Sequence, residues 1–220
     1  MTIFDLLLIL LVLATAAALL LALAALVTRH FKSAARVFAA TLAVWLVYLA
    51  AGAAVALLTP QRSIPLGQDR CFDEMCFAVT SFQRVPSLAS PAGPVRPNGV
   101  FLIVDVRISN QSQRHPQREA GRAGELLDES NRVYQPSPPA MQALAQAQST
   151  SAGPLPGPLP GLDATVQPGQ SLTTRLVFDI PSTATQPAFV LTSHLALNPA
   201  RLVIADDAHF LHKPAIVPLY

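Results

Sequence analysis

Two long apolar runs constrain this chain more than any other feature of its sequence. Leu6–Val27 and Val37–Leu58 each contain 22 residues and no Asp, Glu, Lys or Arg. As helices they would be about 33 Å long, against about 30 Å for the hydrocarbon core of a bilayer. The leader MTIFD lacks the basic residues that open a signal peptide. We therefore predict two transmembrane helices, over residues 6–27 and 37–58, rather than a cleaved signal.

The charges beside the two runs predict how they cross the membrane. The loop 28–36 carries Arg29, Lys32 and Arg36, whereas the N-terminal flank carries Asp5. Basic short loops stay on the cytoplasmic side of a membrane. We therefore expect a multi-pass hairpin whose loop is cytoplasmic, and we expect both termini and the C-terminal domain on the extracytoplasmic side.

Small residues recur within both runs. Ala14, Ala18 and Ala22 are spaced by four residues, as are Gly52 and Ala56. Such stripes let helix backbones approach closely. They favour either packing of the two helices against each other or a homo-oligomer through Ala14, Ala18, Gly52 and Ala56. No ionisable residue lies deep in either run, so an ion or proton path has no support.

The rest of the chain is typical of β structure. All 20 prolines lie after residue 59. The stretch VFLIVDVRISN places Val100, Leu102, Val104, Val106 and Ile108 on one face and Phe101, Ile103, Asp105, Arg107 and Ser109 on the other, which predicts a strand buried on one face. SLTTRLVFDI repeats this period after QPGQ, a type II turn with Gly169 at its third position. Shorter candidate strands are Phe77–Val85, ELLD and RVYQ across the turn ESN, AFVLTS and RLVIA.

Five to seven short strands over about 150 residues predict an antiparallel sandwich. Two segments interrupt them. SPPAMQALAQA predicts a short helix, with Ser137 as its N-cap, that covers an edge or an open end of the sandwich. Residues 149–161 are rich in Pro and Gly and predict an exposed loop. The fold class is therefore α and β in separate parts: a helical hairpin, then an all-β sandwich with one short helix.

The order VFLIVDVRISNQS, LLDESNRVYQ and VQPGQSLTTRLVFDIP resembles a family of bacterial membrane-anchored or lipoprotein immunoglobulin-like domains of unknown function. The resemblance covers roughly residues 70–205. It implies an extracellular β-sandwich in the bacterial cell envelope and brings no catalytic residues with it. The chain departs from the family pattern at Asn131, where Gly is more usual, and in the long loop from Ala140 to Gly161.

The sequence offers little for catalysis. It contains no Gly-x-Ser-x-Gly elbow, no Gly-x-Gly-x-x-Gly and no phosphate-binding loop. Outside the loop 28–36 and Asp5, 12 Lys and Arg residues balance 12 Asp and Glu residues, so no basic surface suggests nucleic acid. We predict no enzyme activity and no cofactor.

A metal site is the alternative chemistry. The stretch DDAHFLH carries Asp206, His209 and His212, whose side chains suit zinc or copper. As a strand, positions 209 and 212 would point to opposite faces, so only a bend would bring them together. A polar C-terminal loop is the competing interpretation. His115 and His194 are further candidate ligands without a predicted place.

The two cysteines, Cys71 and Cys76, lie in RCFDEMCFAV. Outside the cytoplasm a disulfide is the default, and the four residues between them, Phe72 to Met75, suit a hairpin turn. Free thiols, or metal or redox use, are the alternatives. A disulfide in so small a ring would add about 2 kcal/mol of stability.

These features predict a transmembrane hairpin at residues 1–58, a linker at 59–69 and an extracytoplasmic sandwich at 70–220. The linker limits the distance between the sandwich and the lipid to about 35 Å. We therefore expect a non-catalytic binding or assembly module of the envelope whose partners are the bilayer and another membrane or envelope protein. A metal-binding or sensory accessory domain acting on a membrane enzyme or transporter is the alternative.

Overall fold

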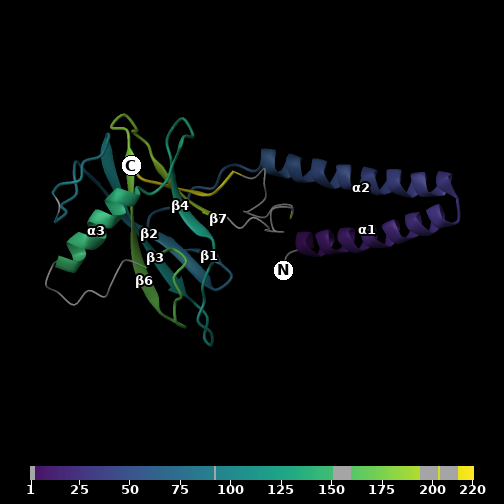
Figure 1. The fold of residues 1–220 in the computed structure, drawn as a ribbon, viewed down its shortest axis with the longest axis horizontal. Coiled ribbons are helices and arrows are strands. Elements are labelled where there is room, and N and C mark those ends of the chain that lie inside the picture. The colour runs from purple at the N-terminus through teal and green to yellow at the C-terminus, as the bar shows by residue number, and fades with distance from the viewer. Residues whose placement is uncertain (1–2, 92, 151–159, 194–202, 204–212) are drawn as a thin grey trace. The chain divides into compact units, whose positions relative to one another are not determined.

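The structure is a computed structural model that describes residues 3–91, 93–150, 160–193, 203 and 213–220. These residues divide into two compact units. Unit 1 contains the described residues of Met1–Gln61 and Leu197–Lys213, and unit 2 contains those of Arg62–Ala196 and Pro214–Tyr220. Unit 1 is helical, and unit 2 holds the strands and one helix (Figure 1).

Unit 1 consists mainly of α1 (Ile3–Val27) and α2 (Phe31–Leu58), which run side by side in opposite directions (Figure 1). Both helices are long and apolar enough to cross a membrane. Trp45 Nε1 donates a hydrogen bond to Thr15 Oγ1 (3.0 Å) and so joins the two helices. The buried residues of α2 are Ala34, Tyr48, Gly52 and Ala56. Small side chains therefore allow the close contact within the hairpin.

The C-terminus of α1 is a Schellman motif. The backbone N–H of His30 donates to the carbonyl of Ala25 (2.7 Å), and that of Arg29 donates to the carbonyl of Leu26 (3.0 Å). Arg29 has φ +58 and takes the left-handed position, where Gly is the usual residue.

The turn between the helices is shorter than the loop 28–36 expected from the sequence. Because the Schellman motif reverses the chain at once, α2 already begins at Phe31. Lys32 and Arg36 therefore lie on the first two turns of α2.

Unit 2 is an antiparallel β-sandwich, as the sequence predicted. Its described strands form two four-stranded sheets of order β1-β2-β3-β6 and β5-β4-β7-β8, seen facing each other in Figure 1. The strands of the first sheet are β1 (Arg70–Phe72), β2 (Met75–Val85), β3 (Val100–Asn110) and β6 (Ser171–Ile180). Those of the second are β4 (Arg122–Leu127), β5 (Val133–Tyr134), β7 (Ala188–Ser193) and β8 (Ile216–Pro218).

The core lies between the sheets. Alternate residues of the central strand β3, from Leu102 to Ile108, point into it, and so do Leu176 and Phe178 of β6. Phe189 of β7 closes the core from the second sheet, with its ring edge to face against Phe178. The alternation read from the sequence in these strands is therefore present in the structure.

A β-bulge at Thr80 lets both halves of β2 face the core. Pairing with β3 shifts register between Val79 and Ser81, which leaves Thr80 as the extra residue. Before the bulge, Phe77 and Val79 point inward, and after it Phe82 does. Because strand side chains alternate, these two halves share a face only if one residue is inserted.

Helix α3 (Pro138–Thr150) covers the outer face of the first sheet. Ala140, Ala143 and Leu144 of α3 pack on Phe101 and Ile103 of β3 and on Val177 of β6. This corrects the expectation that β3 is buried on one face and that the helix covers an open end. The segment before α3 does cover an edge, since Pro136 bridges to Phe178 of β6.

The N-terminal part of unit 2 corrects the predicted linker 59–69. Ile64 N donates to Ile216 O (2.8 Å), and Gly67 N donates to Val79 O (2.8 Å). Ile64 is buried. Residues 62–69 are therefore part of the sandwich, and β8, which the sequence did not predict, pairs with both β7 and this segment.

Two turns have the residues their backbone requires. Gly169 has φ +68, and Gln170 N donates to Gln167 O (3.1 Å), as in the predicted type II turn. Asn131 has φ +58 in the turn between β4 and β5. Asn tolerates this left-handed conformation, so the departure from the usual Gly is accommodated.

Candidate functional site

The candidate site begins at the hairpin that holds both cysteines. Cys71 of β1 and Cys76 of β2 are directly opposite each other and form a disulfide, with Cα atoms 3.9 Å apart. Phe72 pairs with Met75, so the turn contains two residues rather than the four expected. The first of them, Asp73, has φ +52. Cys71 is exposed and Cys76 is buried.

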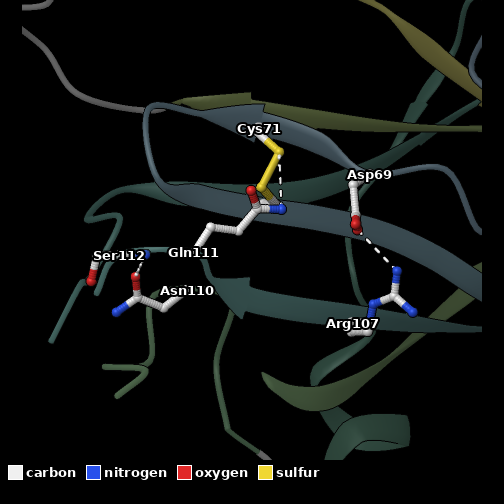
Figure 2. The surroundings of a disulfide bond; sticks show 7 residues. Asp69, Cys71, Arg107, Asn110, Gln111 and Ser112 are labelled. Carbon is white, nitrogen blue, oxygen red and sulfur yellow. Dashed lines mark hydrogen bonds and ion pairs between the residues drawn. A yellow bond between two sulfur atoms is a disulfide. The ribbon is translucent and has the colours of Figure 1, made fainter. Parts of the chain in front are cut away.

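Side chains on both flanks of the disulfide come from neighbouring elements (Figure 2). The amide of Gln111 reaches toward the disulfide and donates to Cys71 Sγ at 3.9 Å. On the other flank, Arg107 of β3 forms an ion pair with Asp69 at 3.0 Å. About a third of each side chain in this pair is exposed, so the pair adds little stability.

Phe72 attaches the hairpin to the second sheet. The guanidinium carbon of Arg122, in β4, lies 3.6 Å from the centre of the Phe72 ring, and the Arg122 side chain is only 11% exposed. Glu119 pairs with Arg122 at 2.8 Å. Stacking of a desolvated guanidinium on an aromatic ring is favourable, so the hairpin is held at the edge of the core.

Asn110 organises the loop that follows β3. Its side-chain oxygen accepts from Ser112 N (2.8 Å). Its amide nitrogen donates to His115 O and Val166 O, both at 2.9 Å. Asn110 is 1% exposed and Ser112 is 3% exposed. Buried, fully bonded polar side chains hold backbone segments in one arrangement, so this loop has a defined conformation.

The hairpin and the loop form one surface. Gln111 N donates to Glu74 O (2.8 Å), and Gln117 Nε2 donates to Glu74 Oε2 (2.8 Å). We call residues 73–74 and 111–117 the hairpin–loop surface. Its exposed side chains are those of Asp73, Glu74, Gln111, Gln113, Arg114, His115 and Pro116. The turn of the cysteine hairpin, which consists of Asp73 and Glu74, is thus bound to the loop through Glu74.

The far end of the loop is anchored by charge. Arg118 donates to the backbone oxygen of Asp163 (2.8 Å) and to its carboxylate (2.6 Å). The hydrogen bond from Arg118 lowers the pKa of Asp163 below its ordinary value, against a smaller opposing effect of burial. Next to this pair, Gln117 and Val166 bridge the loop to the segment before β6.

Two further carboxylates with lowered pKa values lie elsewhere in unit 2. Burial alone would raise the pKa of Asp105, but hydrogen bonds from Arg175 and Ser81 lower it. Burial also opposes ionisation of Asp128, and its pKa is lowered by hydrogen bonds from the backbone of Arg132, from Tyr134 and from the backbone of Ser130. Each carboxylate is bonded to its own neighbours, so neither is a free acid or base.

The predicted metal ligands Asp206, His209 and His212 lie outside the described residues, as does His194. Within the described ranges no group of three His, Cys, Asp or Glu side chains could hold a metal ion. His115 is exposed on the hairpin–loop surface. Most of the Pro/Gly-rich loop 149–161 also falls outside the described residues, and α3 continues into its first two positions.

The small residues proposed for a homo-oligomer differ in their positions. Gly52 and Ala56 are buried within unit 1, Ala18 is half-buried and Ala14 is exposed. The α1–α2 contact therefore uses Gly52 and Ala56 within one chain. A homo-oligomer stays a prediction.

A small hollow of about 20 Å³ lies where β2 faces β7, beside the segment 62–69. Among the described residues of its wall, the polar side chains are those of Gln68 and Arg70. This wall supplies no carboxylate, thiol, hydroxyl or imidazole, so it has no group for nucleophilic or acid–base catalysis. We therefore regard the hairpin–loop surface as the better candidate site.

No protein-family model matches the sequence, and no curated protein matches it. Solved structures of similar architecture include a conserved hypothetical protein from Bacillus anthracis, with 17% identity and a TM-score of 0.44 over 58% of this chain and 88% of that one. An uncharacterized β-sandwich protein from Clostridium difficile has 8% identity and a TM-score of 0.43, over 74% and 96%. A secreted protein from Mycobacterium tuberculosis has 9% identity and a TM-score of 0.39, over 73% and 98%.

These similarities carry no argument about function, and the resemblance to membrane-anchored immunoglobulin-like domains rests on the sequence motifs alone. Sequence reasoning identified the cysteine hairpin but missed the loop 111–117. The sequence contains a signal for this loop, because the polar run QSQRHPQR follows the apolar strand β3 directly.

Proposed function

We propose that this protein is a membrane-anchored, extracytoplasmic binding or assembly module of the cell envelope, without catalytic activity. The observation that carries the proposal is the distribution of exposed apolar side chains. Of the described large apolar residues that are exposed, all but Leu66, Val133 and Tyr220 belong to α1 and α2. Only 11% and 17% of the most apolar windows of these helices are buried.

Exposed apolar faces of this size need lipid or protein around them. The core helix of a soluble domain would be buried by its own chain, whereas these two contact mainly each other. The exposure of both helices therefore supports a multi-pass anchor surrounded by lipid. The basic turn then supports a cytoplasmic position for the turn, and unit 2 would lie outside.

Unit 2 supports a role in binding. The disulfide between Cys71 and Cys76 suits an oxidising compartment. The hairpin–loop surface presents exposed polar and charged side chains on a backbone held by Asn110 and Glu74. A surface ordered before binding loses less conformational entropy on contact with a partner. Only Thr59, Pro60 and Gln61 lie between α2 and unit 2, which favours partners at the membrane.

Topology is tested with single cysteines in a Cys71→Ser/Cys76→Ser background. Gln113→Cys places an exposed thiol on the hairpin–loop surface, and Ser33→Cys places an exposed thiol at the α1–α2 turn. A membrane-impermeant maleimide applied to spheroplasts should label the thiol at position 113 and reach position 33 only after lysis. Labelling of position 33 in unlysed spheroplasts, with position 113 protected, would reverse the proposed orientation.

Binding is tested by photo-crosslinking in living cells. A photoreactive amino acid at Gln113 should give a discrete crosslinked product that contains a second membrane or envelope protein. The same amino acid at Thr173, exposed on β6, is the matched control and should give no such product. Equal product patterns at the two positions would exclude the hairpin–loop surface as the binding site.

A further inference from the structure

We propose that the turn between α1 and α2 binds the headgroups of anionic phospholipids through Arg29, Lys32 and Arg36. The inference rests on the membrane-spanning part of the proposed function. It adds a ligand class at a site away from the hairpin–loop surface, and it does not depend on which side of the membrane the turn occupies.

The three cations have no partner in the part of the chain that the structure describes. All three side chains are exposed, and none forms an ion pair or a hydrogen bond there. Among the described residues of unit 1, Asp5 is the single acid, and it lies in the first turn of α1, at the opposite end of that helix. The turn therefore carries a local positive charge that the described residues do not neutralise.

The cations lie where headgroups would be. Lys32 and Arg36 are four residues apart on α2 and share one face of it. Phe31 and Phe38 are 63% and 62% exposed on the same turns, so apolar and basic side chains alternate at this end of the hairpin. Lys and Arg near a helix end reach the interface with their charged groups while their stems stay in the apolar layer. Clusters of such residues attract anionic lipids.

The identity of residue 29 is a second, independent observation. Arg29 occupies the left-handed position of the Schellman motif, with φ +58. L-residues are disfavoured in this conformation, and Gly is the residue that helices usually place there. The chain keeps a cation at a position where the backbone favours Gly. A role for the charge accounts for this choice, whereas a purely structural turn does not.

Trp45 offers a direct readout, because it is the chain's one tryptophan. It lies nine residues beyond Arg36 on α2, or about 13 Å along the helix axis. Acyl chains of a lipid whose headgroup sits at the turn therefore pass at the depth of Trp45. The full chain is reconstituted in phosphatidylcholine vesicles that contain a dibrominated phosphatidylglycerol or a dibrominated phosphatidylcholine, and quenching of Trp45 fluorescence gives their relative association constant.

At low ionic strength, wild-type protein should prefer phosphatidylglycerol, and the preference should weaken with added salt. Each of R29Q, K32Q and R36Q should lower it, by at most about five-fold, since a basic residue near a membrane surface adds about 1 kcal/mol. The triple variant should show no preference. R29G should lower the preference for phosphatidylglycerol as much as R29Q does. It should keep the helix content, because Gly suits the backbone at this position.

The controls separate a charge effect from a change of fold. K32R keeps the charge and should keep the preference, and R96Q, at an exposed position of unit 2 outside the hairpin–loop surface, should leave the preference unchanged. Inorganic phosphate should weaken the preference no more than sodium chloride does at the same ionic strength; if phosphate alone abolished it, the ligand would be free phosphate and not a lipid.

Equal association constants for the two lipids with wild-type protein, or an unchanged preference in the triple variant, would overturn the proposal. Both leaflets of the vesicles have the same composition, so the result is independent of orientation. A reversed topology in spheroplasts would therefore refute the proposed orientation without affecting this measurement.

Discussion

Asn110 and Asp128 illustrate how single buried polar residues set backbone conformation in unit 2. Asn110 is 1% exposed, and Asp128 is 7% exposed. Asn110 joins the end of β3 to two other segments, whereas Asp128 closes the turn between β4 and β5 by accepting from Ser130 N and Arg132 N. Asn110 satisfies the buried N–H of Ser112, and Asp128 satisfies the part-buried N–H groups of Ser130 and Arg132.

Replacing Asn110 with Ala should destabilise unit 2 by about 2–3 kcal/mol. The change removes three hydrogen bonds. His115 O keeps the bond from Ser112 Oγ and Val166 O keeps the bond from Gln117 N, but the buried Ser112 N loses its acceptor, which is costly. Chemical denaturation followed by circular dichroism measures the effect. Gln113→Ala, at an exposed position of the same loop, should change the free energy of unfolding by less than about 0.5 kcal/mol. Equal effects of both changes would contradict the role of Asn110.

Asp128 should make the stability of unit 2 depend on pH. Its folded-state pKa lies below its ordinary value, and the value in an unfolded chain is about 3.9. The ionised carboxylate therefore adds stability that is present above about pH 4 and is lost as pH falls through the lower folded-state pKa. Urea midpoints measured from pH 7 to pH 2 should fall in acid.

Asp128→Asn should lower the midpoint at pH 7 and flatten part of the acid decline. The remaining part of the acid decline should persist, because the pKa values of Asp105 and Asp163 are also lowered. Glu129→Gln, at the neighbouring exposed position, is the control and should follow the wild-type curve. If the midpoint of Asp128→Asn fell in acid as steeply as that of the wild type, the Asp128 carboxylate would not contribute to the pH dependence of stability.

Residues that act within a turn could be predicted, and residues that act across the fold could not. Gly169 and Asn131 were placed correctly because turn geometry depends on adjacent residues. The partner of Asn110 at Val166 is 56 residues away, and nothing in the local pattern identifies it. The surface formed by Glu74 with Gln117 was missed for the same reason.

At the scale of elements, the bulge in β2 decides which side chains reach the core. Deleting Thr80 should force one half of the strand to point outward, which would remove either Phe82 or the pair Phe77 and Val79 from the core. Loss of one core Phe costs about 3–5 kcal/mol. We therefore expect the deletion to abolish cooperative thermal unfolding of unit 2.

Thr80→Ala is the matched control because it keeps the residue count. It removes one hydrogen bond, from Thr80 Oγ1 to Asp105 O (3.3 Å), so the loss should be at most about 1 kcal/mol. If the deletion were tolerated as well as this substitution, the bulge would have no part in register.

The disulfide should stabilise the hairpin without being required for the fold. Reduction should lower the free energy of unfolding by about 2 kcal/mol, the chain-entropy value for so small a ring. The sandwich should persist, because the contacts of Glu74 and of Phe72 with Arg122 remain. A thermal scan with and without dithiothreitol measures this shift. Cys71→Ser/Cys76→Ser should start at the lower midpoint and show no response to the reductant; collapse of the reduced domain would contradict the expectation.

Long periodic elements could be predicted, and short ones could not. β3 and β6 carry clear two-residue periods, whereas β1 and β8 contain three residues each and offer no period to detect. The position of α3 escaped prediction because it depends on the outward side chains of β3. Phe101 and Ile103 are apolar and lie on the face of β3 that was not expected to be buried, and this signal could have placed the helix on that face.

For the whole molecule, the division into two units predicts that unit 2 folds without the helices. Its described exposed large apolar residues are Leu66, Val133 and Tyr220 alone, which leaves no extended apolar patch to promote aggregation. Residues 62–220, exported behind a signal peptide, should therefore be soluble and contain the Cys71–Cys76 disulfide. Size-exclusion chromatography and thiol titration test this; aggregated or fully reduced material would show that unit 2 depends on α1 and α2.

Hydropathy and charge were sufficient to predict two long helices and a separate β-rich part. They could not predict where the two parts divide, because residues 62–69 resemble a linker in composition. Burial of Ile64 beside Ile216 arises because the first and last segments of unit 2 meet only in the folded state.

The contact between the first and last segments of unit 2 has a consequence for biogenesis. Ile216 bonds to both Arg62 and Ile64, and Leu219 is fully buried in the core. The sandwich therefore cannot close before residue 219 has left the ribosome, whereas the cysteine hairpin needs only a few consecutive residues. In the proposed topology, in which unit 2 is exported, an oxidised hairpin would precede a nascent chain whose strands β3 and β6 still expose their apolar faces. This interval is when the chain is most open to chaperones and proteases.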